Sequence, residues 1–570
     1  MNEQMFKMGW FVDAYKQGNI NYLLWDSGKK KGTVVLPTGA GKSGIIYANI
    51  VRHINEAPDN AKIIFNISAP ILKLEAQLLN DYFEVARIIF KDKIDRGEFM
   101  FFINSSADGD AYDVENLNAD VQRFDEIGKF IASKTAKFAI VASCHKSLDK
   151  FAEKIDELNE HATVITYLDE AHLVVSETRD DVSYDKLSEE GKERFNVLHK
   201  LCSCSYIYGL TATPDKYVME EINKFAGEEP NYKIVDIPAR KLIAENKILP
   251  VKTFIREVSN GDESKITPEI CVSFMELVKR ENPEIKHKIL VTCSSTDHLE
   301  KLSSALGKKF KVFSTCSKNG TSSTEGDEET QIDEVKFIKE VDDWDGDCFV
   351  LHIRQLIQGI DVKTLTDCII YNSVRLNDGV KRTIIQTIGR VLRPMAGERG
   401  LDVEFRKKKK GNVLFLIGQD DFDGVKKQIT GFLLKYYGRD GYESFTCNIT
   451  QDYGDIGKVK TALGNGNSHF GDDYLTNTLD ELIKTLMVDM EKYIKEKVLP
   501  KYRAIVKVAA KTGQKLNPSV AKNEILRMQN KYRHFFGEVD EETKFDTFEL
   551  FSSVDFMKSV SDLFKKYGIE

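Results

Sequence analysis

The chain has 570 residues, of which 42% are hydrophobic and 30% charged, a composition typical of a folded protein with roughly two to four domains. The formal net charge of −8 excludes a general attraction to nucleic acid, so any binding of a polyanion must come from local basic patches. The nine cysteines form no CxxC or Cys/His cluster, and no apolar run approaches the roughly 18 residues of a membrane-spanning helix. We therefore expect a cytoplasmic, non-secreted protein without a zinc or iron–sulfur site.

The first motif lies at residues 34–43, where an apolar strand is followed by a glycine-rich turn and the start of an apolar-periodic helix. Gly39 and Gly41 let consecutive backbone amides point at one phosphate, and the helix N-terminus adds its partial positive charge there. In such a loop Lys42 reaches the β- and γ-phosphates of ATP, while the Ser43 hydroxyl binds Mg²⁺. The predicted cofactors are therefore ATP and Mg²⁺. The predicted nucleotide contacts are Pro37, Thr38, Gly39, Ala40, Gly41, Lys42 and Ser43.

Short apolar runs then alternate with helical stretches in two series, which predicts an α/β fold with two parallel sheets covered by helices on both faces. The runs lie at 62–68, 100–104, 137–142, 164–168 and 206–210, and then at 288–293, 310–314, 348–353, 367–371 and 412–417. A Gly/Ser/Thr/Glu-rich stretch at 317–330 is predicted to be mobile. The predicted organisation is a first domain over 1–235, a linker over 236–250, a second domain over 251–440 and an α-helical C-terminal accessory region over 441–570.

An acidic pair, Asp169 and Glu170, follows the fourth run of the first series. The end of a parallel strand is the ligand edge of a sheet, so Asp169 is placed to hold Mg²⁺ and Glu170 to polarise an attacking water. An isolated Asp-Glu pair is more often a solvated turn, but the preceding strand and the upstream phosphate loop favour the catalytic interpretation. Thr211 and Thr213 follow the next run, where their hydroxyls either connect the ATP site to the rest of the fold or cap a turn.

A helix expected from about residue 380 carries Gln386, Arg390 and Arg393. The two arginines are three residues apart and therefore project from one helical face. Two guanidinium groups on one face, without nearby acidic partners in sequence, suit a γ-phosphate whose charge grows during transfer, so Arg390 and Arg393 are candidates for catalysis. Gln386 on the same helix is a third candidate. A plain basic surface stripe is the alternative interpretation.

These segments resemble, in order, motifs I, II, III, V and VI of the superfamily 2 DEAH-box helicases and translocases. The matching residues are 37–43, 169–172, 211–214, Gly359 with Asp361, and 386–393. The sequence looks most like the motor subunits of type I and type III restriction enzymes and related DNA helicases. The resemblance implies two RecA-like domains in tandem with ATP held between them. It also implies that Gly359 and Asp361 contact the nucleotide and that Arg390 and Arg393 act as arginine fingers.

The implied function is an ATP-dependent nucleic-acid helicase or translocase. DNA is the favoured polymer, because Thr-Ala-Thr stands at 211–213 where many RNA helicases have Ser-Ala-Thr. Weaker matches to motifs Ia, Ib and IV add contacts to one strand, through hydroxyls and amides that need little net basicity. The predicted nucleic-acid contacts are Ser68, Pro70, Lys73, Gln77, Ser143, His145, Thr211, Thr213, Ser294 and Ser295. Gln4 either reads the adenine or is a solvated N-terminal residue.

Other features leave alternatives open. The basic run at 406–410 either touches phosphates or forms a solvated hairpin. Arg503, Lys507 and Lys511 repeat every four residues and form either a grip for a duplex arm or a solvated helix face. The second functional hypothesis is an ATP-gated nucleic-acid sensor or clamp in a restriction or defence complex, with a protein partner bound by the helical tail. Since the phosphate loop begins within the first forty residues and no convincing nuclease motif follows, we expect no cleavage chemistry in this chain.

Overall fold

The computed structural model describes residues 28–70, 82, 86–104, 121–175, 187–258, 266–316, 320–332, 334–353, 362–372, 376, 378–395, 398, 403–418, 422–438, 440–447, 475–477, 488, 491–512, 562 and 565–567. The chain divides into two compact units. The first comprises Met1–Pro238 together with Arg354–Lys363 and Asp378–Arg390. The second comprises Ala239–Ile353, Thr364–Asn377 and Val391–Glu570.

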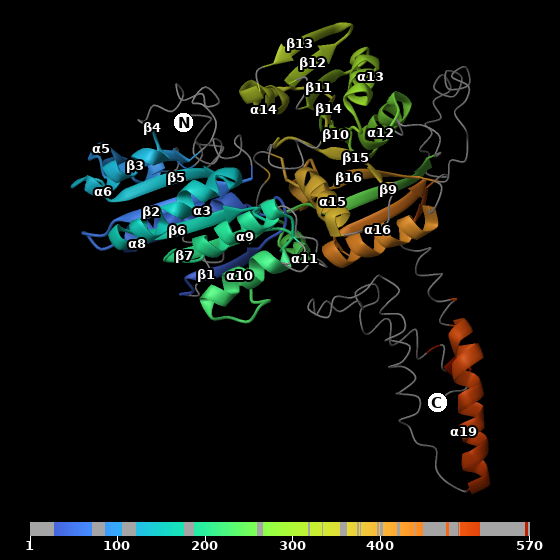
Figure 1. The fold of residues 1–570 in the computed structure, drawn as a ribbon. Coiled ribbons are helices and arrows are strands. Elements are labelled where there is room, and N and C mark those ends of the chain that lie inside the picture. The colour runs from blue at the N-terminus through green and yellow to red at the C-terminus, as the bar shows by residue number, and fades with distance from the viewer. Residues whose placement is uncertain are drawn as a thin grey trace. The chain divides into compact units, whose positions relative to one another are not determined.

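The first unit contains an eight-stranded sheet of order β4-β3-β5-β2-β6-β7-β1-β8, in which all neighbouring strands are parallel (Figure 1). The strands are β1 (Lys31–Val35), β2 (Ile63–Ala69), β3 (Phe99–Asn104), β4 (Val121–Arg123), β5 (Phe138–Cys144), β6 (Thr163–Asp169), β7 (Tyr206–Thr211) and β8 (Val235–Asp236). The α-helices are α3 (Lys42–Glu56), α5 (Lys91–Asp95), α6 (Gly128–Ala132), α7 (Leu148–Glu153), α8 (Ile155–His161), α9 (Glu189–Leu201), α10 (Lys216–Ala226) and α15 (Asp378–Val391), the last of which ends one residue into the second unit. Short 3₁₀ turns lie at η4 (Phe124–Glu126), η5 (His145–Ser147) and η6 (Ala171–Leu173).

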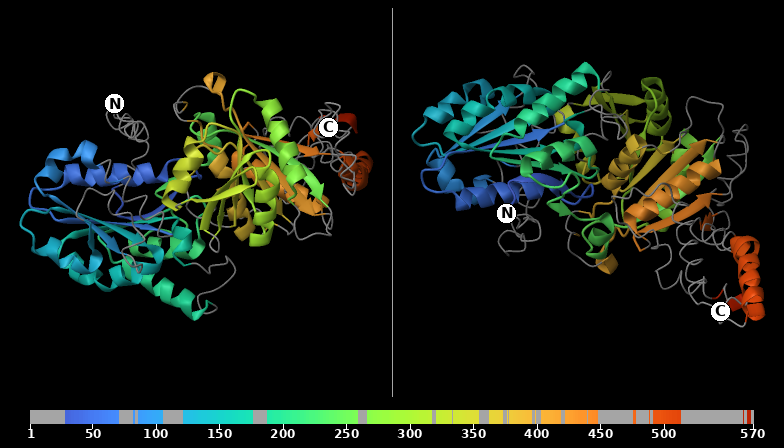
Figure 2. Two further views of the ribbon diagram at one scale, coloured as in Figure 1. Left: turned by 90° about the horizontal axis from the view of Figure 1, so that it is seen from above. Right: turned by 60° about the horizontal axis from the view of Figure 1, so that its bottom comes forward.

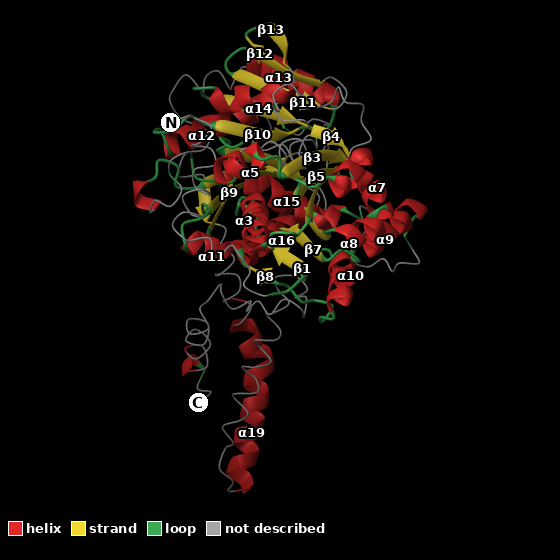
Figure 3. Ribbon diagram, turned by 90° about the vertical axis from the view of Figure 1, so that its left-hand side faces the viewer, coloured by secondary structure: helices red, strands yellow, loops and turns green. Residues whose placement is uncertain are grey.

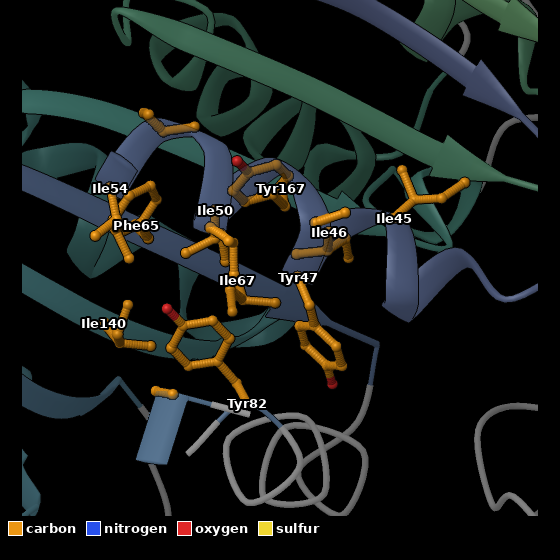
Figure 4. Packing of buried hydrophobic residues seen from close by; sticks show 14 of the residues in the cluster. Ile45, Ile46, Tyr47, Ile50, Ile54, Phe65, Ile67, Tyr82, Ile140 and Tyr167 are labelled. Atoms are coloured by element: carbon orange, nitrogen blue, oxygen red, sulfur yellow. The ribbon is translucent and has the colours of Figure 1, made fainter. Parts of the chain in front are cut away.

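The core of this unit explains why its central strands read as continuous apolar runs. Every residue of β2 and β5 is buried, because helices cover both faces of the sheet (Figure 2). On one face, the isoleucines of α3 lie against side chains of β2, with Phe65 and Ile67 among them (Figure 4). Burying side chains of this size contributes about 1.5–3 kcal/mol each. The packing holds α3, and with it the glycine-rich turn before it, against the sheet.

The second unit contains a ten-stranded sheet of order β13-β12-β11-β14-β10-β15-β16-β9-β17-β18. Its neighbouring strands are parallel except for the pairs β11–β12, β12–β13 and β17–β18. The strands are β9 (Val251–Val258), β10 (Lys288–Thr292), β11 (Lys311–Cys316), β12 (Gly320–Glu325), β13 (Glu328–Ile332), β14 (Cys348–His352), β15 (Asp367–Asn372), β16 (Gly411–Gly418), β17 (Tyr442–Cys447) and β18 (Leu475–Asn477). The helices are α11 (Ala239–Ala244), α12 (Pro268–Glu281), α13 (Thr296–Gly307), α14 (Glu334–Asp343), α16 (Phe422–Tyr437) and α19 (Leu499–Thr512), with a 3₁₀ turn η9 (Val403–Phe405) and a π-helical segment η12 (Ile494–Val498).

The predicted α/β class with two sheets of mainly parallel strands is confirmed. The stretch predicted to be mobile differs, since its described residues form much of the hairpin β12–β13. Two buried hydroxyl pairs hold this hairpin, Ser314 with Ser322 and Ser303 with Thr324, both at 2.8 Å. These polar side chains therefore satisfy one another inside a sheet rather than facing water.

The region beyond residue 441 is also not wholly helical. Strands β17 and β18 extend the edge of the second sheet, and the described residues 491–512 are helical (Figure 3). The sequence of β17 alternates buried Tyr442, Ser444 and Thr446 with more exposed residues, a strand pattern that its small polar side chains obscure. No helix among the described residues has both the length and the apolar character needed to cross a membrane.

Candidate nucleotide-binding and catalytic site

The chemistry-bearing residues of the first unit gather where β1, β6 and β7 end. These strands are neighbours in the sheet, with Asp169 opposite Leu210 and Val35 opposite Thr211. The backbone continues this pairing one residue further, because the Leu36 amide donates to the Thr211 carbonyl at 2.9 Å. The phosphate loop, the acidic pair and the Thr211 turn therefore share one edge of the sheet, which is the ligand edge of open α/β folds.

The turn between β1 and α3 has the backbone of an anion site. Gly39 and Gly41 adopt φ values of 84° and 90°, in the left-handed region that glycine enters without strain. Gly41 is the N-cap of α3, and no side chain caps that helix end. Amides at the start of an uncapped helix remain available to an anion, and the helix dipole favours negative charge there.

Lys42, the first residue of α3, forms an ion pair with Glu170 across the loop, with 3.0 Å between Nζ and Oε1. The two side chains are 9% and 17% exposed. Glu170 follows β6 with φ 48° and ψ 50°, a left-handed conformation that is strained for a residue with a side chain. The abrupt turn separates Glu170 from the strand direction and presents its carboxylate to Lys42.

The neighbouring carboxylates have pKa values shifted in opposite directions. Burial raises the pKa of Asp169 to about 6, and the charge of Glu170 adds to this effect. Burial also acts to raise the pKa of Glu170, but the charges of Lys42 and its neighbours outweigh it and hold that pKa below its ordinary value. Glu170 therefore ionises at a lower pH than Asp169, with Lys42 as its counter-ion.

His172, two residues after Glu170, connects Gln386 to the Thr211 turn through hydrogen bonds. The Thr211 hydroxyl donates to the Thr213 carbonyl at 3.1 Å, so its oxygen must accept from His172 Nδ1, which lies 2.9 Å away. Nδ1 then carries the proton and Nε2 is an acceptor, which the Gln386 amide contacts as donor at 3.3 Å. Burial lowers the pKa of His172 to about 4, so this neutral tautomer persists at neutral pH.

Helix α15 contributes further contacts to the first unit. Arg382 pairs with Asp215 at 3.7 Å, and Asp215 also caps α10 by accepting from two backbone amides. Close to the other end of α15, a Cβ on Gly389 would lie 2.3 Å from Thr38 Cβ, so only glycine fits there. Arg390 follows it, is 9% exposed, and lies near enough for its charge to lower the pKa of both carboxylates.

Unsatisfied polar atoms indicate that the site suits a nucleotide. Within the described residues, the buried Thr38 Oγ1 and Glu170 Oε2 have no hydrogen-bond partner. Phosphate oxygens and a water are groups that would supply the missing partners. The described chain has no cluster of three or more metal-ligating His, Cys, Asp or Glu side chains. A Mg²⁺ held by the Ser43 hydroxyl, Asp169, phosphate oxygens and waters fits this sparse donor set, since Mg²⁺ ordinarily binds through one or two carboxylates beside a substrate's phosphates.

The other predicted residues are placed as follows. Ser68, Ser143, His145, Thr211 and Thr213 are buried, Pro70 is half-buried, and Ser294 and Ser295 are exposed. Ser143 donates to Asn66 Oδ1 at 2.6 Å, and Ser295 caps α13. Arg393 is half-buried in the second unit. Gln4, Lys73, Gln77, Gly359 and Asp361 lie outside the described residues. Contact of these side chains with nucleic acid or nucleotide stays a prediction.

Two functional contacts escaped sequence reasoning. Asp215 follows the Thr-Ala-Thr-Pro segment and begins a helix, a capping signal that does not reveal its second partner Arg382. Gly389 stands between two predicted catalytic residues, and an isolated glycine inside a helical pattern is itself a signal of close approach.

Comparisons with known proteins identify the relatives of this chain. Residues 11–216 match the family model described as "Type III restriction enzyme, res subunit". Among solved structures, the chain is similar to the Type ISP restriction-modification enzyme LlaBIII bound to DNA, at 12% identity and a TM-score of 0.48 over 100% of this chain and 40% of that one. The chain thus spans about 40% of the length of that enzyme.

The chain is also similar to two further solved structures. One is Dbp5 of S. cerevisiae bound to RNA and ADP BeF3, at 14% identity and a TM-score of 0.46 over 78% of this chain and 94% of that one. The other is an HsdR subunit fragment of a type I restriction enzyme from Vibrio vulnificus, at 13% identity and a TM-score of 0.40 over 74% of this chain and 65% of that one. Among curated proteins, no sequence match was found. The matched segment, a little over a third of the chain, contains the phosphate loop, the Asp-Glu-Ala-His motif and the Thr-Ala-Thr-Pro motif, so residues 11–216 are similar to the res subunit family of type III restriction enzymes in the part that holds the candidate site.

Proposed function

We propose that the protein is an ATP-dependent helicase or translocase that acts on nucleic acid, with DNA as its polymer. The observation that carries this proposal is the partly buried ion pair of Lys42 with Glu170 beside an uncapped helix start. Lys42 can leave Glu170 for the more negative phosphates of ATP, because both partners compete for one ammonium. Binding of ATP would then free the Glu170 carboxylate to act on water.

The chain's own residues have distinct roles in this scheme. The amides of the turn at 39–43 and the Lys42 ammonium hold the phosphates, and Glu170 orients water and accepts its proton. The Arg390 guanidinium balances the charge that develops on the phosphates. Mg²⁺, held by Ser43 and Asp169, would supply a further positive charge to the phosphate oxygens when bound. The hydrogen bonds from Gln386 through His172 to Thr211 link α15 to the turn at 211–214.

Neutral His172 suits a linking role, since it donates through one nitrogen and accepts through the other. A change in the position of Gln386 therefore alters the hydrogen bonding of the Thr211 turn, which the sequence assigns to the nucleic-acid side. This connection is the route by which we expect hydrolysis to be coupled to movement along a strand.

The test compares ATP hydrolysis by the wild type, Lys42→Ala and Glu170→Gln, with Glu153→Gln on the exposed side of α7 as the control. We expect Glu170→Gln to lose roughly 10²–10⁴-fold in kcat, the usual contribution of a general base, and Lys42→Ala to be inactive, while the control is unchanged. Glu170→Gln should retain ATP binding, because the phosphate loop is intact. A Glu170→Gln protein that hydrolyses ATP within tenfold of the wild-type rate would overturn the assignment.

A further inference from the structure

The basic run at 406–410 is not a uniformly solvated patch. Arg406 and Lys408 are 2% and 1% exposed, whereas Lys407 and Lys409 between and after them are exposed. The alternation is that of extended backbone with one face turned inward. A cation is therefore placed in the interior of the second unit at Lys408, and its surroundings explain why.

The Lys408 ammonium is fully used by three backbone carbonyls. Nζ donates to Leu365 at 2.8 Å, to Val391 at 2.7 Å and to Arg393 at 3.0 Å. Val391 is the last residue of α15, and Leu365 lies two residues before β15. The last carbonyls of a helix have no partner inside the helix, and a cation there also interacts favourably with the helix dipole.

The neighbouring groups fix the same helix end. The Leu392 carbonyl lies between those of Val391 and Arg393 in the chain and accepts from the Leu249 amide at 2.8 Å. Gly411, at the start of β16, has no room for a side chain, since a Cβ there would lie 2.7 Å from both the Val391 oxygen and Leu392 Cδ2. Three consecutive carbonyls, 391 to 393, are thus held by donors from two other segments.

This helix end matters because of what α15 carries. Arg390 immediately precedes the first clamped residue, and Gln386 lies about one turn earlier. Lys408 therefore binds the carbonyls of two of the three residues that directly follow Arg390 in the chain. Greater freedom of the backbone at residues 391–393 would change the direction in which the Arg390 side chain points.

Burial of the ammonium is unfavourable in itself. It lowers the pKa of Lys408 to about 8, although the negative charge of Asp367 acts to raise that pKa. A helix end on the surface can be satisfied by water or by a glycine turn at no such penalty. A buried ammonium instead donates three hydrogen bonds in fixed directions from a single nitrogen atom.

We propose that Lys408 is a positioning residue for ATP hydrolysis, which clamps the C-terminal end of α15 and thereby sets the direction of Arg390. The inference rests on the proposed function, because it assigns Arg390 to the hydrolytic site. Lys408 itself touches neither nucleotide nor nucleic acid in this scheme. Its loss should therefore reduce kcat and leave the KM for ATP nearly unchanged.

The experiment uses the full chain with Lys408→Met, and with Lys409→Met as the matched control from the same run. We expect Lys408→Met to lower kcat at least tenfold with KM within about twofold, and to speed amide hydrogen exchange in peptides that cover 386–395. Lys409→Met should match the wild type in both. Lys408→Gln keeps two hydrogen-bond donors on a shorter side chain, so its kcat should lie between those of Lys408→Met and the wild type. This variant serves as the test if the methionine variant does not fold.

A double-mutant comparison separates positioning from plain stability. If Lys408 acts through Arg390, then adding Lys408→Met to Arg390→Ala lowers kcat no further. Multiplicative losses in the double variant, unchanged hydrogen exchange in Lys408→Met, or a kcat within twofold of the wild type would each overturn the proposal. A wild-type protein without ATP hydrolysis contradicts the proposed function itself, whereas wild-type hydrolysis with an unaffected Lys408→Met protein contradicts only the role of Lys408.

Discussion

The hydroxyl of Thr211 has both of its hydrogen-bonding capacities engaged, and this fixes the protonation of its neighbour. It donates to the Thr213 carbonyl and accepts from both the Thr213 amide, at 3.0 Å, and His172 Nδ1. Removing the hydroxyl would leave the buried Nδ1–H of His172 without its 2.9 Å acceptor, with only the more distant Glu170 Oε2, at 3.5 Å, nearby. A buried donor without a partner costs about 1–3 kcal/mol.

We therefore predict that Thr211→Val lowers the free energy of unfolding by about 1–3 kcal/mol, because valine keeps the shape but not the acceptor. Thr211→Ser keeps the hydroxyl and should lose less. Denaturant titration of the two variants beside the wild type measures the difference. Equal stability of the valine and serine variants would show that the hydroxyl does not hold His172.

His53, on α3, gives the first unit a dependence of stability on pH. Its ring lies 5.0 Å from Tyr206 and 6.4 Å from Phe65, and burial lowers its pKa to about 4, with Arg52 adding to the effect. In the unfolded chain the pKa of histidine is about 6.5. The unfolded state thus binds more protons between pH 4 and 6.5, and stability falls as the pH is lowered through that window.

We predict that lowering the pH from 7 to 5 costs the wild type about 1–2 kcal/mol more than His53→Phe, which keeps the ring contacts but cannot bind a proton. Denaturant midpoints at the two pH values provide the comparison. A wild type and a phenylalanine variant with the same pH dependence would place His53 in a more solvated environment than the structure describes.

Among the elements, α15 combines an unusual set of contacts on one face. Arg382, Gln386 and Gly389 are spaced four and three residues apart, so they project together, and they meet Asp215, His172 and Thr38 in turn. The middle contact is a hydrogen bond and the last is a close approach of a glycine to the phosphate loop. The helix is therefore matched to the site along much of its length.

Gly389→Ala tests that match, because the added Cβ would lie 2.3 Å from Thr38 Cβ and must displace one of the two elements. We predict a loss of about 10- to 100-fold in kcat for ATP hydrolysis, since a displacement near 1 Å at a catalytic site has effects of this size. Gly379→Ala, an exposed position in the same helix, should be neutral or slightly stabilising. Equal activity of the two variants would mean that α15 does not approach the loop this closely during turnover.

Much of the fold follows from sequence, because the buried parallel strands are apolar along their whole length and the helices between them are periodic. The same holds for Lys42 and Glu170, since the glycine-rich turn and the strand before the acidic pair define where each must lie. The partners of His172 and Gly389 could not be predicted, because Gln386 is 214 residues from the histidine in the chain. A sequence pattern predicts the helix or strand to which a residue belongs, but not which distant residues it contacts.

Lys408 and the β12–β13 hairpin show a second limit of sequence reasoning. Charged and hydroxyl side chains predict exposure on average, so the sequence favours a phosphate contact or a solvated hairpin at 406–410 and a mobile stretch at 317–330. Yet Lys408 is buried by three carbonyl acceptors, and Ser322 and Thr324 by hydroxyl partners. Burial of polar groups depends on partners that come from elsewhere in the fold.

For the whole molecule, charge limits how nucleic acid can be held. With a net charge of −8, the chain has no long-range attraction to a polyanion, and binding must come from contacts formed in a defined pose. Hydrolysis that depends on such contacts should respond to the kind of polymer present. Strand displacement would then distinguish a motor that separates strands from a clamp that only holds them.

The most direct test of the central claim is ATP hydrolysis by the purified wild type, first alone and then with duplex DNA, single-stranded DNA or RNA. We predict that DNA raises kcat at least tenfold and that RNA raises it less, with Lys42→Ala inactive under every condition. A rate that is the same with every polymer and without any would contradict a nucleic-acid motor.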